Sequence, residues 1–490
     1  MRILLVNPSF EYFLSATEVF NPLGYIAIGS YLDAIGEEVK CIDRNVKKVN
    51  INRLLDTFKP DLLAVSVIAS SGVRDAVKVS KAAHERNIPV MWGGTFPSLR
   101  SELILKEDYV DYVIIGEGEY TLRDLLEVMK GNMSVEDCLG LAYKKNGKVI
   151  INGDRPFIDL AELPPTNYEL FDMEKYILKN AYGGRQLFIY QSKGCPLHCA
   201  FCSNTTYHRS THRSRPVRVI VDEIKYLIEK YHIDIIVFAD ELWCPNKNDM
   251  REFCRLIKEE NIKIKWSCFS RLGQFNREDY ILMHECGLYA AFIGIESGNQ
   301  QMLDRIHKNI KVKDVIPYFE SLKDIGVAFT TFFIIGYPNE TIDQLRDTVN
   351  LIQSIPVNTV PVYHFIPLPG TELFNEVIKT RKYTPPKNLK EAAKSMDTIT
   401  LGKNLSTVPD VDLNVISSRI QWNAFIHKKD DKDVSSKGFA FTVIVNTIKS
   451  LVKKGPILCV YEGCKAAAHF LHIFWYAHGH KNIRKKYNLR

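Results

Sequence analysis

Residues Ser192–Asn204 read SKGCPLHCAFCSN and place three cysteines, Cys195, Cys199 and Cys202, in the spacing CxxxCxxC. A loop this short can wrap three thiolates around one iron–sulfur cube. Three ligands leave the fourth iron of a 4Fe–4S cluster open to a small molecule. A structural zinc ion would normally need a fourth protein ligand, for which the loop offers His198. The spacing therefore favours an iron–sulfur cluster over zinc or three unligated thiols.

Short apolar runs alternate with amphipathic stretches from Gln186 onwards, as expected of repeated βα units. Six units are too few for a closed eight-stranded barrel but sufficient for a partial (βα)6 TIM-type barrel. Enzymes with such barrels place their chemistry at the carboxyl ends of the strands. The six strands are predicted at Leu187–Gln191, Ile233–Ala239, Ile264–Phe269, Ala290–Glu296, Phe329–Ile335 and Val360–Ile366.

The first 150 residues show the same alternation with a different kind of strand end. Each predicted strand is followed by small or polar residues, in the stretches NPS, SVIASS, GGTFPS and GEGE. Ligands of open parallel sheets bind at this edge, so the pattern predicts a doubly wound, Rossmann-like α/β domain with a glycine-rich rim. Its strands are predicted at Ile3–Val6, Glu38–Ile42, Leu62–Ser66, Val90–Trp92 and Tyr112–Ile115.

These patterns divide the chain into four parts. Residues 1–150 form the doubly wound domain, and residues 186–380 form the partial barrel. Residues 151–185 combine prolines, acidic residues and aromatics with little periodicity, which indicates a linker lying across a surface. Residues 381–490 are predicted to be a helical region that caps the substrate pocket. The stretches KNLKEAAKSMDTI and LNVISSRIQWNAFIH are its clearest helices.

The composition is that of a globular chain, with 46% hydrophobic and 25% charged residues. A net charge of +7 over 490 residues is too small to indicate a nucleic-acid partner. The opening residues MRILLVNPSF lack the pattern of a signal peptide, so a cytoplasmic location is expected. Cysteines remain reduced there, and a cluster of them indicates metal before disulfide.

The carboxyl-terminal stretch AAAHFLHIFWYA, residues 466–477, is apolar but too short to span a bilayer. With lysines upstream and the basic end KNIRKKYNLR, it could lie in a membrane interface as a peripheral contact. It could equally be a core-packing helix with a solvated basic tail. The interfacial arrangement would suit a lipid-like substrate.

The cysteine loop, with Phe201 directly before the third cysteine, resembles the signature loop of the radical S-adenosylmethionine (SAM) superfamily. Motifs at the later strand ends agree with the resemblance: VFADELW, SCFSRLGQFN, FIGIESGNQ, FIIGYPNET and FIPLPGTELF. It covers roughly Gln186 to Phe374. It implies that Cys195, Cys199 and Cys202 hold a 4Fe–4S cluster. The residues that it implies near SAM are Phe201, Asp240, Glu241, Ser270, Arg271, Gly294, Glu296 and Ser297.

One departure concerns the second strand end, where relatives often carry Gly-Gly-Glu and this chain has Ala239-Asp240-Glu241. A polar contact to the SAM amino group is therefore better supported than a backbone role. The resemblance further implies that one electron cleaves SAM and releases a 5′-deoxyadenosyl radical, which abstracts hydrogen from an unactivated carbon. An external one-electron reductant, such as a flavodoxin or ferredoxin, would supply that electron.

The first 150 residues resemble the cobalamin-binding domain that precedes many radical SAM barrels. The DxHxxG loop of many cobalamin proteins is absent, since NPSFEYFLS follows the first strand and His84 is the first histidine. Bound cobalamin should therefore lack an imidazole ligand from this loop. The alternative is a domain kept as a scaffold or for binding substrate. The residues implied at the cobalamin site are Ser66, Gly93, Gly94, Gly116, Glu117 and Gly118.

The sequence thus predicts a cobalamin-dependent radical SAM enzyme that methylates an unactivated carbon of a small-molecule or lipid-like substrate. One SAM would methylate cobalamin and a second would generate the radical. A radical cyclase or rearrangement enzyme, in which cobalamin carries no methyl group, is the nearest alternative. An iron–sulfur electron carrier or sensor is the alternative of another class, and a zinc-containing metabolite-binding protein is the third. Neither has any need for the motifs at the SAM-side strand ends.

Overall fold

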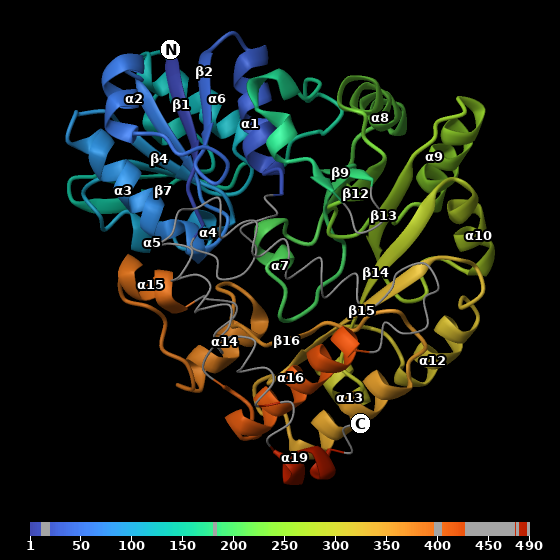
Figure 1. Cartoon of the computed structure of the whole chain (residues 1–490). Coiled ribbons are helices and arrows are strands. Elements are labelled where there is room, and N and C mark those ends of the chain that lie inside the picture. The colour runs from blue at the N-terminus through green and yellow to red at the C-terminus, as the bar shows by residue number, and fades with distance from the viewer. Residues whose placement is uncertain (11–19, 180–183, 396–403, 427–475, 477–479, 488–490) are drawn as a thin grey trace, which may run out of the picture.

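The computed structural model describes residues 1–10, 20–179, 184–395, 404–426, 476 and 480–487. Two seven-stranded sheets dominate these residues, and helices connect most of their parallel strands (Figure 1). Sheet A belongs to the amino-terminal part and sheet B to the middle of the chain. The predicted combination of a Rossmann-like sheet and a partial barrel is confirmed.

Sheet A has the strand order β2-β1-β3-β4-β5-β6-β7, in which β1 to β5 are parallel and β6 and β7 antiparallel. Its strands are β1 Arg2–Asn7, β2 Glu38–Asp43, β3 Leu62–Ser66, β4 Val90–Gly93, β5 Tyr112–Ile114, β6 Leu141–Lys145 and β7 Lys148–Ile151. Its helices are α1 Leu23–Ala34, α2 Ile51–Phe58, α3 Val73–His84, α4 Thr95–Ser98, α5 Ser101–Ile104 and α6 Glu119–Met129.

The two faces of sheet A are both covered, as the near-continuous apolar strands require. Ile3 and Leu5 of β1 belong to the hydrophobic cluster that contains α1 and α6 residues. Leu4 and Val6 point to the opposite face and pack in the cluster that contains α2 and α3 residues. The alternation within a single strand therefore assigns a helical layer to each face.

The β6–β7 hairpin extends sheet A at its antiparallel edge and was not predicted from the sequence. Its turn is Asn146-Gly147, and both residues have positive φ angles, 51° and 72°. An Asn-Gly pair with two positive φ angles is the preferred two-residue hairpin turn. The signal was therefore present in the sequence KKNGK.

Sheet B has the order β16-β15-β14-β13-β12-β9-β8, in which six strands are parallel and only β8 is antiparallel. Its strands are β8 Leu178–Lys179, β9 Arg185–Ile189, β12 Ile235–Phe238, β13 Lys265–Ser270, β14 Leu288–Glu296, β15 Ala328–Ile335 and β16 Val362–His364. The connecting helices include α8 Val217–Tyr231, α9 Lys247–Glu259, α10 Arg277–Glu285, α11 Gln300–Arg305, α12 Val312–Glu320 and α13 Ile342–Ser354.

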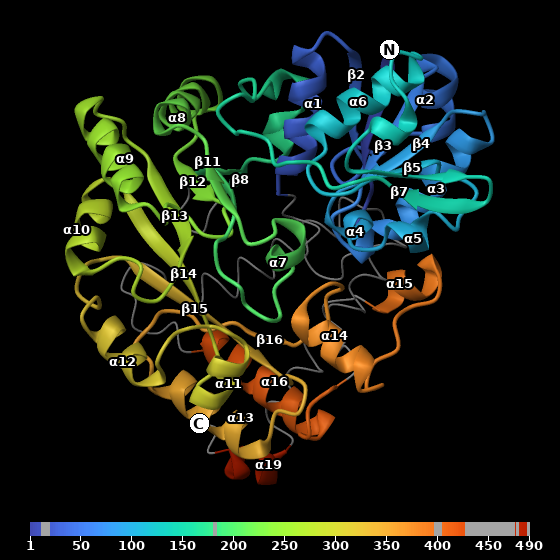
Figure 2. The same ribbon diagram turned by 180° about the vertical axis from the view of Figure 1, so that it is seen from behind.

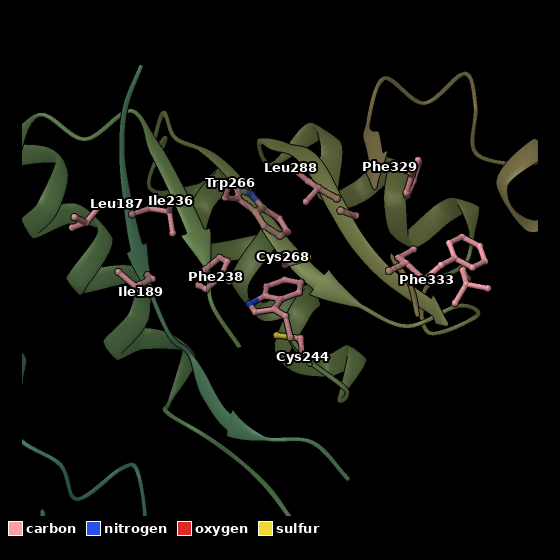
Figure 3. Packing of buried hydrophobic residues seen from close by; sticks show 14 of the residues in the cluster. Leu187, Ile189, Ile236, Phe238, Cys244, Trp266, Cys268, Leu288, Phe329 and Phe333 are labelled. Carbon is pink, nitrogen blue, oxygen red and sulfur yellow. The ribbon is translucent and has the colours of Figure 1, made fainter. Parts of the chain in front are cut away.

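The core of the partial barrel lies between sheet B and its helices. Phe238 and Trp266 are completely buried there and meet ring to ring at 5.8 Å between centroids (Figure 3). Capping boxes begin two of the helices: Asn276 with Asp279 at α10, and Thr341 with Gln344 at α13. The chain therefore enters α10 and α13 at defined residues. The loops between the preceding strands and these helices are held in place at their helical ends.

The connection after sheet A, predicted to be a linker across a surface, is mostly exposed or half-buried and is anchored by a few buried side chains. Tyr168 and Tyr176, in and beside the short 3-10 turns of this segment, are 2% and 1% exposed. The Tyr168 hydroxyl donates to Glu223 of α8 at 2.6 Å. The Tyr176 hydroxyl donates to Asp43 of β2 at 3.0 Å. The two tyrosine hydroxyls thus donate to carboxylates of two different domains. These hydrogen bonds offset the cost of burying the hydroxyl groups.

The carboxyl-terminal region crosses the molecule from one sheet to the other (Figure 2). Helix α15, Leu389–Ser395, buries Leu389 and Ala392 in the cluster beneath sheet A, whereas α16, Asp410–Ile426, contacts β16. Helix α15 falls within the first stretch predicted to be helical, and α16 overlaps the second, residues 413–427, but begins earlier, at Asp410. Helices α14, Glu372–Lys379, and α19, Lys481–Lys486, complete the described part.

No helix among the described residues is long and apolar enough to cross a membrane. The predicted interfacial or core-packing segment, residues 466–477, lies outside the described residues apart from Tyr476.

Candidate active site

The cysteine loop begins at the end of a small hairpin formed by β10, Ser192–Gly194, and β11, His212–Ser214. Gly194 has a φ of +83°, and a Cβ there would lie 2.1 Å from the carbonyl oxygen of Thr211. Only glycine can therefore carry the chain from β10 into Cys195. The loop is closed by Asn204, whose side chain accepts from the Cys195 amide at 3.0 Å and donates to the Cys195 carbonyl at 2.7 Å.

The middle of the loop is held against the carboxyl ends of the barrel strands. The Ala200 amide donates to the Ile306 carbonyl at 3.0 Å, and the Ala200 carbonyl accepts from the Leu373 amide at 3.0 Å. Cys199, next to Ala200, is 8% exposed, and Cys195 and Cys202 are half-buried. Backbone contacts to two later loops thus fix the three thiols at the barrel mouth.

The arrangement fits a cluster better than a single metal ion. Within the described part of the chain, no three His, Cys, Asp or Glu side chains converge closely enough to hold one ion. A cube ligated through three different irons requires thiolates that stand further apart. Burial raises the pKa of the Cys199 thiol, and the nearby ammonium of Lys308 offsets only part of that rise. The Lys308 cation acts toward the thiolate, the form that binds iron.

A second group of polar residues converges at the ends of β13 and β14. Glu296 ends β14 with a φ of +76°, beside a register shift between β14 and β15, and its carboxylate accepts from Lys308 Nζ at 2.9 Å. Arg271 Nη2 donates to the carbonyl oxygens of Lys308 and Asn309 at 2.9 and 2.7 Å. A left-handed φ at a glutamate in a strand is strained, and such strain clusters at functional sites.

Gly294 makes room for this group, because a Cβ there would lie 2.2 Å from Glu296 Oε1. Lys308 was not predicted as a site residue. Its position in the stretch RIHKN, shortly after GIESG, was the only signal in the sequence. Burial acts to lower the pKa of Lys308, but the adjacent Glu296 carboxylate outweighs it, so the Lys308 pKa is raised.

The other predicted SAM residues are engaged with protein groups. Asp240 is 2% exposed, and its carboxylate accepts from the Ser192 and Gln191 amides at 2.5 and 3.2 Å. Burial raises the Asp240 pKa to about 7. Glu241 accepts from the Gly194 amide at 2.9 Å and lies 3.3 Å from His208 Nε2. Asp240 and Glu241 therefore brace the hairpin before the cysteine loop.

The side chains of three further predicted residues contact groups other than Glu296, Lys308 and Arg271. Ser270 Oγ lies 3.2 Å from the Tyr280 hydroxyl, and Ser297 Oγ lies 3.1 Å from Thr348 Oγ1. Phe201 packs edge to face against Tyr337, with 6.0 Å between ring centroids.

A cavity of about 270 Å³ lies at the carboxyl edge of sheet A, facing the hairpin before the cysteine loop. Its volume is near the lower end of the roughly 300–1,000 Å³ range of small-molecule sites. From the barrel side, Tyr190, Lys193, Tyr207, His208 and Glu241 line the cavity. All six residues predicted at the cobalamin site line it from the other side: Ser66, Gly93, Gly94, Gly116, Glu117 and Gly118.

The glycine rim fits the close approach of a bulky ligand. Gly94 has a φ of +105°, and a Cβ there would lie 2.7 Å from the Val67 carbonyl oxygen. A Cβ at Gly93 would meet nothing closer than Met91 Sδ at 3.7 Å, so Gly93 leaves open space beside the cavity. Apolar side chains such as Leu5 and Ile114 form much of the remaining wall, as is typical of cofactor sites.

The rim of the cavity is clamped to the barrel by charged pairs. Arg213 of β11 donates to both carboxylate oxygens of Glu117, at 2.7 and 2.9 Å, and Lys193 donates to Glu119 at 2.9 Å. The Tyr207 hydroxyl donates to the Gly116 carbonyl at 3.0 Å. We call Glu117, Glu119, Lys193 and Arg213 the interdomain clasp. It joins the predicted cobalamin rim to the hairpin that leads into Cys195.

Comparison with known proteins agrees with both halves of this geometry. Residues 189–352 match the family model of the radical SAM superfamily, and residues 12–126 match that of the B12-binding domain. An uncharacterized methyltransferase of Pyrococcus horikoshii is 30% identical over 401 residues, covering 78% of this chain and 86% of the relative. The chain belongs to the radical SAM superfamily. It is an enzyme with a 4Fe–4S cluster, SAM and cobalamin as cofactors, which confirms the predicted class and cofactors.

Other radical SAM relatives differ in the reaction that their names describe. An anaerobic magnesium-protoporphyrin IX monomethyl ester cyclase of Rubrivivax gelatinosus is 26% identical, covering 77% of this chain and 70% of the relative. The structure of the radical SAM methyltransferase TsrM from Kitasatospora setae, with tryptophan and a SAM analogue bound, superposes with a TM-score of 0.66. Its identity is 17%, and the match covers 77% of this chain and 76% of that one. At that identity the match shows a shared fold.

Proposed function

We propose that this enzyme transfers a methyl group from SAM to an unactivated carbon of a small-molecule substrate, with cobalamin as the methyl carrier. The observation that carries the proposal is the shared cavity, lined by the glycine rim of the B12-binding domain on one side and by barrel residues beside the cysteine loop on the other. A carrier that serves both domains needs a binding site at their junction. The methyltransferase from Pyrococcus horikoshii supports the same reaction class.

The residues divide the work as follows. Cys195, Cys199 and Cys202 hold the cluster, and Glu296 and Arg271 hold SAM beside it, with Lys308 orienting the Glu296 carboxylate. The cluster that these cysteines would hold, reduced by an external flavodoxin or ferredoxin, would supply the electron for cleaving SAM to a 5′-deoxyadenosyl radical. The barrel orients the substrate and excludes water from the reacting carbon.

The remaining predicted residues support these sites. Asp240 and Glu241 brace the hairpin that leads into the cysteine loop, and Glu241 also faces the shared cavity. Cobalamin occupies the cavity between the rim residues Ser66, Gly93 and Gly94 and the barrel. Further lining or packing residues assigned to the two cofactor sites are Phe201, Ser270, Gly294, Ser297, Gly116, Glu117 and Gly118.

A radical cyclase is the second candidate, supported by the relative from Rubrivivax gelatinosus. The two functions differ in the fate of the SAM methyl group. A methyltransferase moves it to the corrinoid and then to product, whereas a cyclase in which cobalamin carries no methyl group leaves it on methionine.

The test uses the full-length protein reconstituted with iron, sulfide and hydroxocobalamin, and SAM labelled with 13C in the methyl group. With dithionite as reductant, we expect labelled methyl in the corrinoid fraction and 5′-deoxyadenosine in solution, both measured by mass spectrometry. Cys199→Ala should lose the cluster and form no 5′-deoxyadenosine, because a thiolate ligand is missing. Release of 5′-deoxyadenosine with no label in the corrinoid would contradict methyl transfer and favour the cyclase.

A further inference from the structure

The two faces of sheet B differ in how their aromatic residues are covered. On the face toward the helices, Phe238, Trp266 and Phe333 are completely buried in the main hydrophobic cluster (Figure 3). Side chains alternate between the two faces along a strand. Phe269 follows the buried Cys268 in β13, and Phe332 precedes the buried Phe333 in β15, so both point to the other face. They are half-buried, and neither hydrophobic cluster includes them.

Four aromatic rings follow one another across this second face, one on each of β13, β14, β15 and β16. The distances between ring centroids are 5.0 Å from Phe269 to Phe292, 6.3 Å from Phe292 to Phe332, and 6.1 Å from Phe332 to Tyr363. The outermost ring, Tyr363, is 54% exposed. We call Phe269, Phe292, Phe332 and Tyr363 the aromatic stripe. Half-exposed rings in a continuous row are unusual on a sheet that serves only as a scaffold.

The stripe is continuous with the Glu296 group. Phe269 directly precedes Ser270, and Phe332 pairs in register with Gly294, two residues before Glu296. A Cβ at Gly294 would lie 2.2 Å from Glu296 Oε1 and 3.0 Å from Lys308 Nζ, so the Glu296–Lys308 pair occupies the space beside this glycine. The stripe therefore begins where the proposed SAM residues end.

The two cations beside the stripe already have roles. Lys308 binds Glu296. Arg271 Nη2 donates to two backbone carbonyls, and its Nε, which has no hydrogen-bond partner among the described residues, is left for SAM in the proposed function. A phosphorylated or carboxylated substrate would need a free cation there, because a buried charge without a partner is costly. The Tyr363 hydroxyl is the polar atom of the stripe, at its exposed end. This chemistry suits a ligand with a hydrocarbon body and at most a hydroxyl-sized polar group.

We infer that the aromatic stripe binds the substrate, and that the substrate is an uncharged, largely hydrocarbon molecule whose apolar body lies across Phe269, Phe292 and Phe332. This inference rests on the proposed function, since it assigns the substrate class of the same barrel. Rings that stack on an apolar ligand add contact energy beyond the area they bury. The reacting carbon would lie toward the Gly294 end, next to the proposed SAM residues.

The test measures ligand binding without turnover. Full-length holoenzyme is titrated anaerobically with the neutral apolar dye Nile red, and geranylgeraniol and geranylgeranyl diphosphate are compared as competitors. We expect saturable dye binding that Phe332→Ala weakens about tenfold and Tyr363→Ser weakens about threefold. Geranylgeraniol should displace the dye at a lower concentration than its diphosphate.

Tyr226→Ser is the matched control, because Tyr226 is 38% exposed on α8 and its ring packs against Tyr168 and Tyr231. It should leave dye affinity unchanged. Tyr363 lies at the exposed edge of the stripe, so Tyr363→Ser should fold. This variant still tests the inference if Phe332→Ala does not fold. Unchanged affinity in both stripe variants, or better displacement by the diphosphate, would overturn the inference.

A stripe already filled by another part of the chain or by a second copy would leave the wild type without saturable dye binding, which also overturns it. The methyl-label experiment needs no substrate. Failure of the substrate assignment is therefore distinguishable from failure of the proposed function.

Discussion

Sheets A and B both place their candidate sites at the carboxyl ends of parallel strands, but they build those sites from different materials. The rim of sheet A is backbone: Gly93, Gly94 and Gly116 line its cavity without side chains. The rim of sheet B consists of charged side chains that satisfy one another, as Glu296 and Lys308 do. One edge is shaped to admit a bulky group closely, and the other to hold fixed charges beside a cluster.

The difference indicates which kind of substitution should damage each site. At a glycine rim, adding atoms should be harmful and removing charge should matter little. At a charged rim, removing one partner leaves a buried charge unpaired, which costs more than the pair itself contributes. The interdomain clasp combines both kinds of rim, because its charged residues Glu117 and Glu119 lie among the glycines of the sheet A rim and pair with Arg213 and Lys193.

The largest effect is expected from Gly94→Val. The Cβ would lie 2.7 Å from the Val67 carbonyl oxygen, and the φ of +105° disfavours any side chain, so the rim must shift. We expect hydroxocobalamin binding to weaken about 100-fold or more, measured by equilibrium dialysis. The iron content of the barrel should remain at the wild-type level, because the cysteine loop belongs to the other half of the molecule.

Gly93→Ala is the matched control for backbone strain. Its Cβ would be 3.7 Å from the nearest atom and its φ needs no glycine, so the empty domain should tolerate it. A loss of cobalamin affinity in this variant would mean that the ligand itself contacts Gly93. Wild-type cobalamin affinity in Gly94→Val would show that the glycine rim does not form the cobalamin site.

An intermediate effect is expected at the charged rim. Glu296→Gln keeps the size of the side chain but leaves the Lys308 ammonium without its carboxylate. We expect SAM affinity to fall by about 1–3 kcal/mol, measured by anaerobic calorimetry, with the cluster retained. Arg271→Ala should weaken SAM by a similar amount. Glu372→Gln, at an exposed glutamate near His307, serves as the control. Equal SAM affinity in wild type, Glu296→Gln and Arg271→Ala would disprove the assignment of both residues.

The sequence predicted the backbone rim better than the charged one, for a physical reason. Strands and glycines are local signals, so the glycine-rich strand ends could be read from the sequence, and the resemblance to cobalamin-binding domains assigned Gly93, Gly94 and Gly116 to one site. The partners of Glu117 and Glu296 are Arg213 and Lys308, and nothing in the local sequence marks either residue as a partner. Pairing of charges depends on tertiary contacts that the spacing of residues does not encode.

The anchors of the connection after sheet A depend on tertiary contacts in the same way. Tyr168 and Tyr176 are buried, and Glu223 and Asp43 accept hydrogen bonds from their hydroxyl groups. The β6–β7 hairpin is different, since Asn146-Gly147 is a local signal that was overlooked.

The smallest effect is expected at Glu340, which follows β15. Unlike Glu296, Glu340 has no cation paired with it among the described residues. Glu340 is completely buried; one carboxylate oxygen accepts from the Gly336 amide at 2.6 Å, and the other has no hydrogen-bond partner among the described residues. Burial raises the Glu340 pKa to about 7, whereas an unfolded chain has the ordinary value near 4.5.

Between pH 4.5 and pH 7, Glu340 therefore holds a proton in the folded state that it releases in the unfolded state. Stability from this group is full below about pH 4.5 and is lost as pH rises through 7.

Glu340→Gln removes that titration while keeping an oxygen for the Gly336 amide. We expect the variant to match the wild type in thermal unfolding at pH 5 and to exceed its free energy of unfolding at pH 8 by about 1–3 kcal/mol. Glu372→Gln should show the wild-type pH dependence, because its carboxylate is exposed. A change of the same size at both pH values would mean that the Glu340 pKa is the same in the folded and unfolded states, and it would contradict the raised pKa. A loss of stability at pH 8 would instead show that the ionised carboxylate is held by a charge partner, as we argue for Glu296.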